Sequence, residues 1–232
     1  MTPAPTSLQL LVLALSWVSY FALHSLLIAP KTKHWIARRF PRIMPAYRLL
    51  FNLQAVVLLV ALIILSVHWK GPKLWHFDGV VAWLITSLNL AALAGFVGTT
   101  RAYDGAEFWG LRQWREKRTR GGEGERLVIS TVHRYVRHPW YFFGLILLWT
   151  REMDATLLVG SGLATLYLWI GSRWEEIRLV RRYGTAYRDY QQRVPGLVPW
   201  PGKVLSAEEA HQLETLAQEQ IIKGRKHHGQ SG

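Results

Sequence analysis

The chain has 232 residues, half of them hydrophobic, with 28 Lys and Arg against 15 Asp and Glu and a formal net charge of +13. It contains no cysteine, which excludes disulfides, thiolate metal sites and a cysteine nucleophile. Because the hydrophobic residues gather in long blocks, the composition excludes an ordinary soluble domain and favours a membrane protein.

Apolar blocks predict membrane-crossing helices in the order 8–29, 49–67, 80–100, 139–150 and 155–171. The first three are long enough to cross a hydrocarbon core of about 30 Å. The last two are short and lie close together, so they predict a tight helical hairpin, with a re-entrant or interfacial hairpin as the alternative. The first block lacks the positive n-region of a cleaved signal, and we expect it to be retained. The sequence therefore predicts an all-α polytopic membrane protein with about five transmembrane helices.

The distribution of basic residues predicts the orientation of these helices. The segments 31–48, 101–138 and 172–232 hold 6, 9 and 10 Lys plus Arg, whereas the segments after the second and fourth spans hold 2 and 1. By the positive-inside rule we expect a multi-pass protein of the cytoplasmic (inner) membrane, with the N-terminus outside and the C-terminus cytoplasmic. Topological bias and attraction to anionic head groups account for the net charge, so we expect membrane lipids as partners and no nucleic acid.

The region after the fifth span is predicted to be helical and to leave the membrane. The helix should break at Gly184 and stop at Pro195. A second helix then begins with a capping box, in which Ser206 is the N-cap and Glu209 lies three residues on. Its apolar residues fall at helical spacing and predict an amphipathic helix that lies on its own domain or on the bilayer: Ala210, Leu213, Ala217 and Ile221.

Charged and ring side chains gather where the fourth span begins and the fifth ends. The stretch "RYVRHPWYFF" runs from Arg134 directly into the fourth span, and Glu175 and Glu176 follow the fifth. A hairpin would bring both groups to the same face of the membrane. Snorkelling charges and a proline in a first helical turn are the structural alternative for each residue singly. Ionisable groups at membrane depth are costly, so we interpret the cluster as functional.

These motifs resemble the membrane-embedded methyltransferases that include isoprenylcysteine carboxyl methyltransferase and the phospholipid N-methyltransferases. The shared pattern is Arg-His-Pro-x-Tyr, then Glu-Glu-x-x-Leu, Tyr-Gly-x-x-Tyr-x-x-Tyr and Val-Pro, and it covers residues 126–201. The stretches "HSLLIAPK", "YRLLFNL" and "FWGLRQW" look most like the bacterial methanethiol S-methyltransferase branch. The resemblance implies three regions: a three-helix membrane region (1–100), a cofactor-binding methyltransferase core (101–201) and a cytoplasmic amphipathic tail (202–232).

The resemblance implies S-adenosyl-L-methionine as the cofactor, held by the C-terminal half in a pocket facing the cytoplasm. Carried over by position, the binding residues are Leu127, Val128, His133, His138, Pro139, Trp140, Tyr141 and Glu175. The chemistry of the cofactor agrees, because it needs a carboxylate for its ammonium, a cation or backbone donors for its carboxylate and rings for its base. Glu175, Arg137 and Tyr141 supply these groups in one place.

The predicted reaction is an in-line displacement at the sulfonium methyl, which depends mainly on alignment and the exclusion of water. A thiol acceptor needs a base, and a carboxylate does not. His24, in the first span, and Glu176 are the candidate proton acceptors. We expect no metal ion.

The acceptor is predicted from one departure from the family pattern. The prenylcysteine enzymes carry an arginine four residues before the first glutamate of the pair, and Gly171 stands there in this chain. Arg173 lies about 200° away around a helix and cannot simply substitute, although it stays with Asn52 as a substrate candidate. We therefore expect a small thiol such as methanethiol as acceptor. The alternatives are a lipid amine or prenyl-type carboxylate, and a non-enzymatic membrane protein with a vestigial fold.

Overall fold

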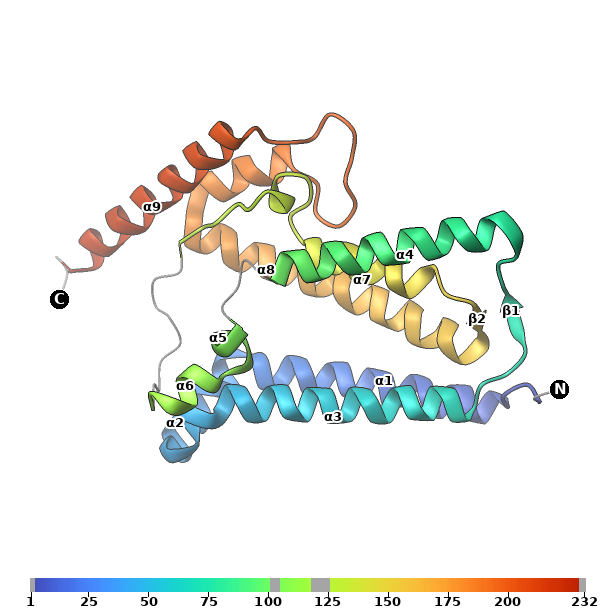
Figure 1. Ribbon diagram of the computed structural model, residues 1–232. Helices are drawn as coiled ribbons and strands as arrows, with labels where there is room; N and C mark the ends of the chain where they lie inside the picture. The colour runs from blue at the N-terminus through green and yellow to red at the C-terminus, as the bar shows by residue number, and fades with distance from the viewer. Residues whose placement is uncertain (1–2, 101–104, 118–125, 230–232) are drawn as a thin grey trace. The chain divides into compact units, whose positions relative to one another are not determined.

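The computed structural model describes residues 3–100, 105–117 and 126–229. The chain divides into two compact units. Unit 1 comprises Met1–Leu90, Tyr103–Glu123 and Leu148–Tyr167, and unit 2 comprises Ala91–Ala102, Gly124–Leu147 and Leu168–Gly232. Almost all regular structure in the described part is helical (Figure 1), which confirms the all-α prediction. The three regions expected from the resemblance stay a prediction.

The helices and strands follow one another in this order: α1 (Ser7–Ile28), α2 (Pro30–Arg39), η1 (Pro41–Ala46), α3 (Tyr47–His68), β1 (Lys73–Trp75), α4 (Gly79–Thr100), α5 (Gly105–Trp109), α6 (Leu111–Arg115), η2 (Val132–Arg134), α7 (Pro139–Trp149), β2 (Met153–Asp154), α8 (Ala155–Arg193) and α9 (Ala207–Gly229). The two short strands pair antiparallel, with Lys73 opposite Asp154.

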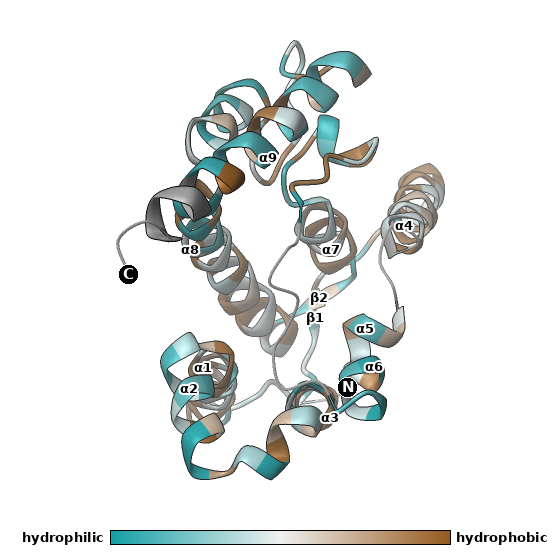
Figure 2. Ribbon diagram, turned by 90° about the vertical axis from the view of Figure 1, so that its left-hand side faces the viewer, coloured by the Kyte–Doolittle hydropathy of each residue, from teal (hydrophilic) through white to brown (hydrophobic). Residues whose placement is uncertain are grey.

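Within the described part of the chain, four helices are long and apolar enough to cross a membrane: Ser7–Ile28, Pro41–His68, Gly79–Thr99 and Ala155–Arg193. Their side chains point largely outward, since only 6% of the most apolar window of α1 is buried inside the protein. Trp83 in α4 is 76% exposed, which would be costly in water and is favourable in hydrocarbon. The ribbon of α4 is correspondingly apolar, whereas α2 and α9 are largely hydrophilic (Figure 2).

The fourth predicted span is the short helix α7. Its 11 residues extend about 16 Å, roughly half of a hydrocarbon core. The described residues thus hold four long apolar helices and one short one where five spans were expected, and the number of crossings stays a prediction.

Unit 1 is organised around the packing of α1 against α3. Leu13, Trp17 and Leu62 form its buried core. Where α1 ends, the Tyr47 hydroxyl donates a hydrogen bond to the carbonyl of Leu27 at 2.6 Å. In the same unit, the Thr150 hydroxyl donates to the side-chain oxygen of Asn89 at 2.8 Å, which fits an interhelical bond between polar residues of apolar helices.

Unit 2 depends on a break in α8. Gly184 has φ +60° and ψ −131°, so the chain turns here as the sequence predicted. A β-carbon at this position would also collide with the side-chain oxygen of Gln220 in α9. The C-terminal part of α8, α9 and the segments beside them bury a common apolar core: Ile129, Tyr183, Ala186, Tyr187, Tyr190, Val194, Leu205, Ala210, Leu213 and Ala217.

The start of α9 confirms the predicted capping box. The backbone N–H of Ser206 donates to Glu209 at 2.7 Å, and the backbone N–H of Glu209 donates to the Ser206 hydroxyl at 3.1 Å. These bonds and an ion pair with Arg193 hold the pKa of the Glu209 carboxyl below its ordinary value. The amphipathic helix therefore lies on its own unit, one of the two placements expected for it.

Candidate cofactor site

The centre of the candidate site is a buried ion pair between Arg137 and Glu176. Arg137 precedes α7, and its Nε and Nη2 donate to one oxygen of Glu176 at 2.8 and 2.6 Å. The side chains are only 8% and 6% exposed, so water contributes little to either charge. The remaining Arg137 nitrogen, Nη1, donates to the carbonyls of Gln191 and Val194. The guanidinium is therefore largely occupied by the protein itself.

The segment 191–196, which follows the break in α8, holds this pair from the other side. The side-chain amide of Gln191 donates to the second oxygen of Glu176 at 2.9 Å. The backbone N–H groups of Arg137 and His138 donate to the carbonyls of Pro195 and Gly196 at 2.9 and 3.0 Å. A β-carbon on Gly196 would lie 3.3 Å from Arg137 Nη2, so the small residue permits this close approach.

His138 lies between the two adjacent glutamates. Its Nε2 is 3.1 Å from Oε1 of Glu176, and its Nδ1 is 3.7 Å from Oε2 of Glu175. The imidazole stacks on the ring of Tyr141, with the centroids 5.2 Å apart and the planes 9° from parallel. Because the ring is buried and held on two sides, its orientation is fixed.

The two glutamates have different environments although they are neighbours in the sequence. Glu176 is buried and accepts four hydrogen bonds, from Arg137, His138 and Gln191. The Glu175 side chain is 41% exposed, and the Tyr141 hydroxyl lies 3.4 Å from it. Of the two, Glu175 is the carboxylate with room for an external cation.

The remaining residues predicted for the cofactor also lie in unit 2. Pro139 is buried, and the ring of Trp140 lies 5.4 Å from that of Phe96. Leu127 packs against the core between α8 and α9, whereas Val128 is 68% exposed. The predicted cofactor-binding residues before α8 and Glu175 within α8 thus lie in the same unit.

His133 is held by one local contact and one distant contact. Its Nδ1 lies 2.7 Å from the Ser130 hydroxyl, and its carbonyl accepts a hydrogen bond from the Tyr190 hydroxyl at 2.6 Å. Burial, together with the nearby His138, lowers the pKa of the His133 imidazole below its ordinary value. At neutral pH the ring is uncharged, and it can offer either a donor or an acceptor.

Arg173 is not part of the buried corner. It is exposed, and its guanidinium lies over the ring of Trp169 with Cζ 5.9 Å from the centroid. A β-carbon on Gly171 would meet nothing within 4 Å among the described residues, so the space at this position is open.

The two predicted residues of unit 1 have separate environments. The ring centroid of His24 lies 4.8 Å from that of Phe51. It lies 6.0 Å from the centroid of Tyr20 and 6.1 Å from that of Tyr167. Its Nδ1 is buried and has no hydrogen-bond partner among the described residues. Asn52 instead donates its side-chain amide to the carbonyl of Phe108 at 3.0 Å and so holds α5.

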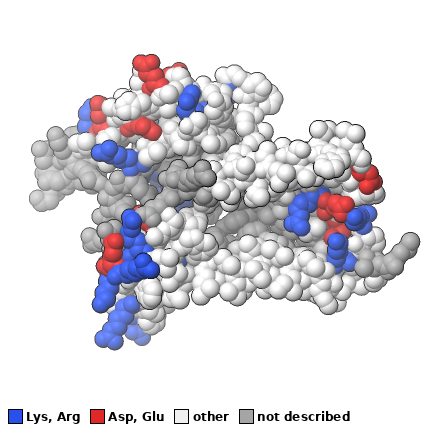
Figure 3. All heavy atoms as spheres, in the orientation of Figure 1, with Lys and Arg blue, Asp and Glu red and all other residues white. Residues whose placement is uncertain are grey.

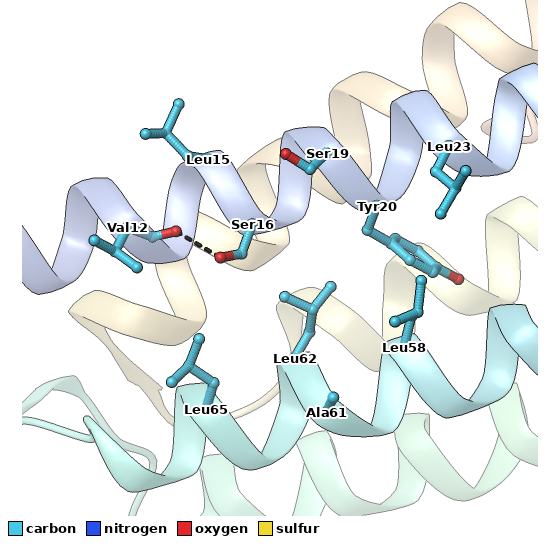
Figure 4. Close-up of a pocket in the computed structure, with 10 residues that line it drawn as sticks. All are labelled: Val12, Leu15, Ser16, Ser19, Tyr20, Leu23, Leu58, Ala61, Leu62 and Leu65. Atoms are coloured by element: carbon cyan, nitrogen blue, oxygen red, sulfur yellow. Dashed lines mark hydrogen bonds between the residues drawn. The ribbon is translucent and has the colours of Figure 1, made fainter.

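An apolar groove of about 530 Å³ runs between α1 and α3 (Figure 4). Leucines of both helices line it, and the hydroxyls of Ser16, Ser19 and Tyr20 are its polar groups. Ser16 donates to the Val12 carbonyl at 2.7 Å, so that hydroxyl is satisfied within its own helix. None of the residues predicted for the site lines this groove.

Sequence reasoning missed two residues of the corner, Gln191 and Gly196. The available signal was the Gly184 break, which allows the chain to return toward Glu176. The sequence indicated the break and the stop at Pro195, but nothing in it indicated which carbonyls and side chains would meet Arg137.

The described helices and this corner define an all-α polytopic membrane protein with a buried polar site. Comparison with known proteins identifies its family. The chain is 30% identical over 205 residues to methanethiol S-methyltransferase 2 of Bradyrhizobium diazoefficiens, covering 84% of this chain and 76% of that protein. It belongs to the methanethiol S-methyltransferase family and is a membrane methyltransferase, as the resemblance predicted.

Two further relatives are also methanethiol S-methyltransferases. The chain is 30% identical over 207 residues to the methanethiol S-methyltransferase of Crocosphaera subtropica, covering 83% of this chain and 76% of the relative. It is 29% identical over 210 residues to that of Mycobacterium tuberculosis, covering 83% and 80%. No protein-family model and no solved structure matches the chain significantly.

Proposed function

We propose that this protein transfers a methyl group from S-adenosyl-L-methionine to a small thiol such as methanethiol and forms a thioether. The observation that carries the proposal is the difference between the two glutamates. Glu176 is saturated by Arg137, His138 and Gln191, whereas Glu175 is partly exposed beside Tyr141 and His138. A partly exposed carboxylate held against stacked rings fits the ammonium of an amino-acid cofactor.

The residues of the corner take different parts in this proposal. Glu175 would bind the ammonium of the cofactor, and the rings of His138 and Tyr141 would form a wall of the pocket. Leu127, Val128, His133, Pro139 and Trp140 would complete it. Arg137 was expected to meet the carboxylate of the cofactor, but its nitrogens already donate to Glu176, Gln191 and Val194. We therefore assign Arg137 to support of the pocket.

When bound, the cofactor supplies an electrophilic methyl on a sulfonium. The acceptor sulfur forms a bond to the methyl carbon as the carbon–sulfonium bond breaks, and the acceptor loses its proton. A proton acceptor must therefore have a free lone pair. Glu176 accepts four hydrogen bonds, so taking a proton would break part of its network. His24, whose buried Nδ1 has no hydrogen-bond partner among the described residues, stays the second candidate.

The proposal also covers the two residues predicted for the substrate, Asn52 and Arg173, and the placement of the protein in the membrane. Of the predicted substrate residues, Asn52 would contribute by holding α5 in place. Arg173 would contribute from the exposed side of α8. The protein would lie in the cytoplasmic membrane with the N-terminus outside, and its basic segments would lie on the cytoplasmic side. Membrane lipids would surround the four apolar helices.

A methyl-transfer screen on the detergent-purified protein tests the proposal. Methanethiol and longer alkanethiols, phosphatidylethanolamine and a prenylcysteine are each supplied with methyl-labelled S-adenosyl-L-methionine. We expect labelled thioether from the small thiols alone. Label on the phospholipid amine or on the prenylcysteine would show instead that the acceptor is lipid-like. Absence of cofactor binding by calorimetry would reject the whole proposal.

A further inference from the structure

The segment that joins α1 to α3 is fixed at the level where two apolar helices end. α1 ends at Ile28 and α3 begins at Tyr47, and each has 22 residues, enough to cross about 30 Å of hydrocarbon. The hydrogen bond from the Tyr47 hydroxyl to the Leu27 carbonyl holds these two ends together. The residues between them, which form α2 and η1, must therefore lie where the helices leave the bilayer. We call residues 30–46 the α2–η1 surface.

The α2–η1 surface is rich in basic residues. It carries five exposed cations and no acidic residue: Lys31, Lys33, Arg38, Arg39 and Arg42. The first acidic residue of the whole chain is Asp78. Along α2, Lys31, Trp35 and Arg38 follow one another at helical spacing of four and three residues, so they share one face.

Apolar side chains stand among these cations. Trp35, Phe40 and Ile43 are 62%, 46% and 41% exposed. The rings of Trp35 and Phe40 meet edge to face with centroids 6.2 Å apart, and the Arg39 guanidinium lies over the Phe40 ring. Tryptophan and basic residues on one face are typical of helices that lie in the head-group region, where rings reach the acyl boundary and cations meet phosphates.

We propose that the α2–η1 surface binds the anionic phospholipids of the surrounding bilayer, with its cations on the phosphates and Trp35, Phe40 and Ile43 inserted below them. Figure 3 shows Lys and Arg atoms, with a smaller number of Asp and Glu atoms among them, at the end of unit 1 where α2 lies, beside an uncharged stretch along α1 and α3. Charge complementarity selects anionic over zwitterionic lipid. The position beside two membrane helices favours a lipid over a nucleic acid, which would need the surface to face away from the bilayer.

The test counts bound lipids by native mass spectrometry on the full chain in neutral detergent, titrated with phosphatidylglycerol or with phosphatidylcholine. The variant replaces Lys31, Arg38 and Arg39 by Gln. Each cation near an anionic surface contributes about fivefold, so phosphatidylglycerol binding should weaken roughly 100-fold, with phosphatidylcholine binding unchanged. The preference of the wild type for phosphatidylglycerol over phosphatidylcholine should also decrease in high salt.

A matched control neutralises three exposed cations of unit 2, Arg188, Lys203 and Lys223, and should keep the wild-type preference. If the first triple variant does not fold, Lys31→Gln with Arg38→Gln should still weaken binding roughly 25-fold. The proposal is overturned if the α2 variants bind phosphatidylglycerol as the wild type does, or if the control loses as much. It is also overturned if these variants lose binding to a DNA duplex while lipid binding stays unchanged.

Discussion

Arg137 gives two of its hydrogen bonds to a single oxygen of Glu176, and both side chains are almost fully buried. The ion pair connects Arg137, two residues before the start of α7, to the middle of α8, and the segment 191–196 closes around it. It therefore acts as the support on which His138 and Glu175 are placed. A pair so enclosed has a large desolvation cost, which only complete partnering offsets.

Removing one partner of the Arg137–Glu176 ion pair should destabilise the protein much more than removing both. Arg137→Met leaves the Glu176 carboxylate buried without its cation, and we expect a loss of about 3–5 kcal/mol in the free energy of unfolding. Arg137→Met combined with Glu176→Met removes both charges and should recover a substantial part of that loss. Urea unfolding in detergent, followed by circular dichroism, measures the difference. Equal losses in the single and the double variant would show that the pair is not coupled as described.

Acid should destabilise unit 2 through His133. Burial, with the neighbouring His138, lowers the pKa of His133 below the ordinary 6.5 of an unfolded chain. The unfolded state therefore takes up a proton first, so stability is complete above pH 6.5 and falls as the pH drops below it. Thermal unfolding at pH 7.5 and 5.5 measures this change. His133→Asn should reduce the pH dependence, whereas His211→Asn, at an exposed histidine, should leave it as in the wild type.

Gly171 distinguishes a small thiol from a prenylcysteine carboxylate as acceptor. Its surroundings are open, so Gly171→Arg should fold. If the acceptor is a small thiol, a cation near a cationic sulfonium should depress turnover, and Gly171→Gln, similar in size but neutral, should depress it less. Initial rates with methanethiol and with a prenylcysteine measure both effects. A gain of prenylcysteine activity in Gly171→Arg would contradict the thiol assignment.

Local patterns in the sequence predicted much of the fold. Uninterrupted apolar runs predicted α1, α3, α4 and the first half of α8, because length and hydropathy alone decide whether a helix suits hydrocarbon. Gly184 and the pair Ser206 and Glu209 predicted a break and a helix start, because each acts within a few residues of itself.

The site was less accessible to sequence reasoning because its contacts are distant along the chain. Arg137 meets carbonyls more than 50 residues away, and no local pattern encodes that meeting. The contrast between Glu175 and Glu176 has a similar origin. Adjacent residues on a helix differ by about 100° in direction, so one lies in the buried corner and the other faces outward. The assignments of His24, Asn52 and Arg173 stay predictions.

The central claim is that Glu175, and not Glu176, binds the cofactor ammonium. Isothermal titration calorimetry with S-adenosyl-L-methionine tests it on wild type, Glu175→Gln and Glu176→Gln. Loss of a hydrogen-bonded charge costs about 1.5–3 kcal/mol, so Glu175→Gln should bind the cofactor roughly 10- to 150-fold more weakly with an unchanged unfolding midpoint. Glu176→Gln should instead lower the unfolding midpoint, because it weakens the support around Arg137. Wild-type cofactor affinity in a folded Glu175→Gln variant would contradict the account.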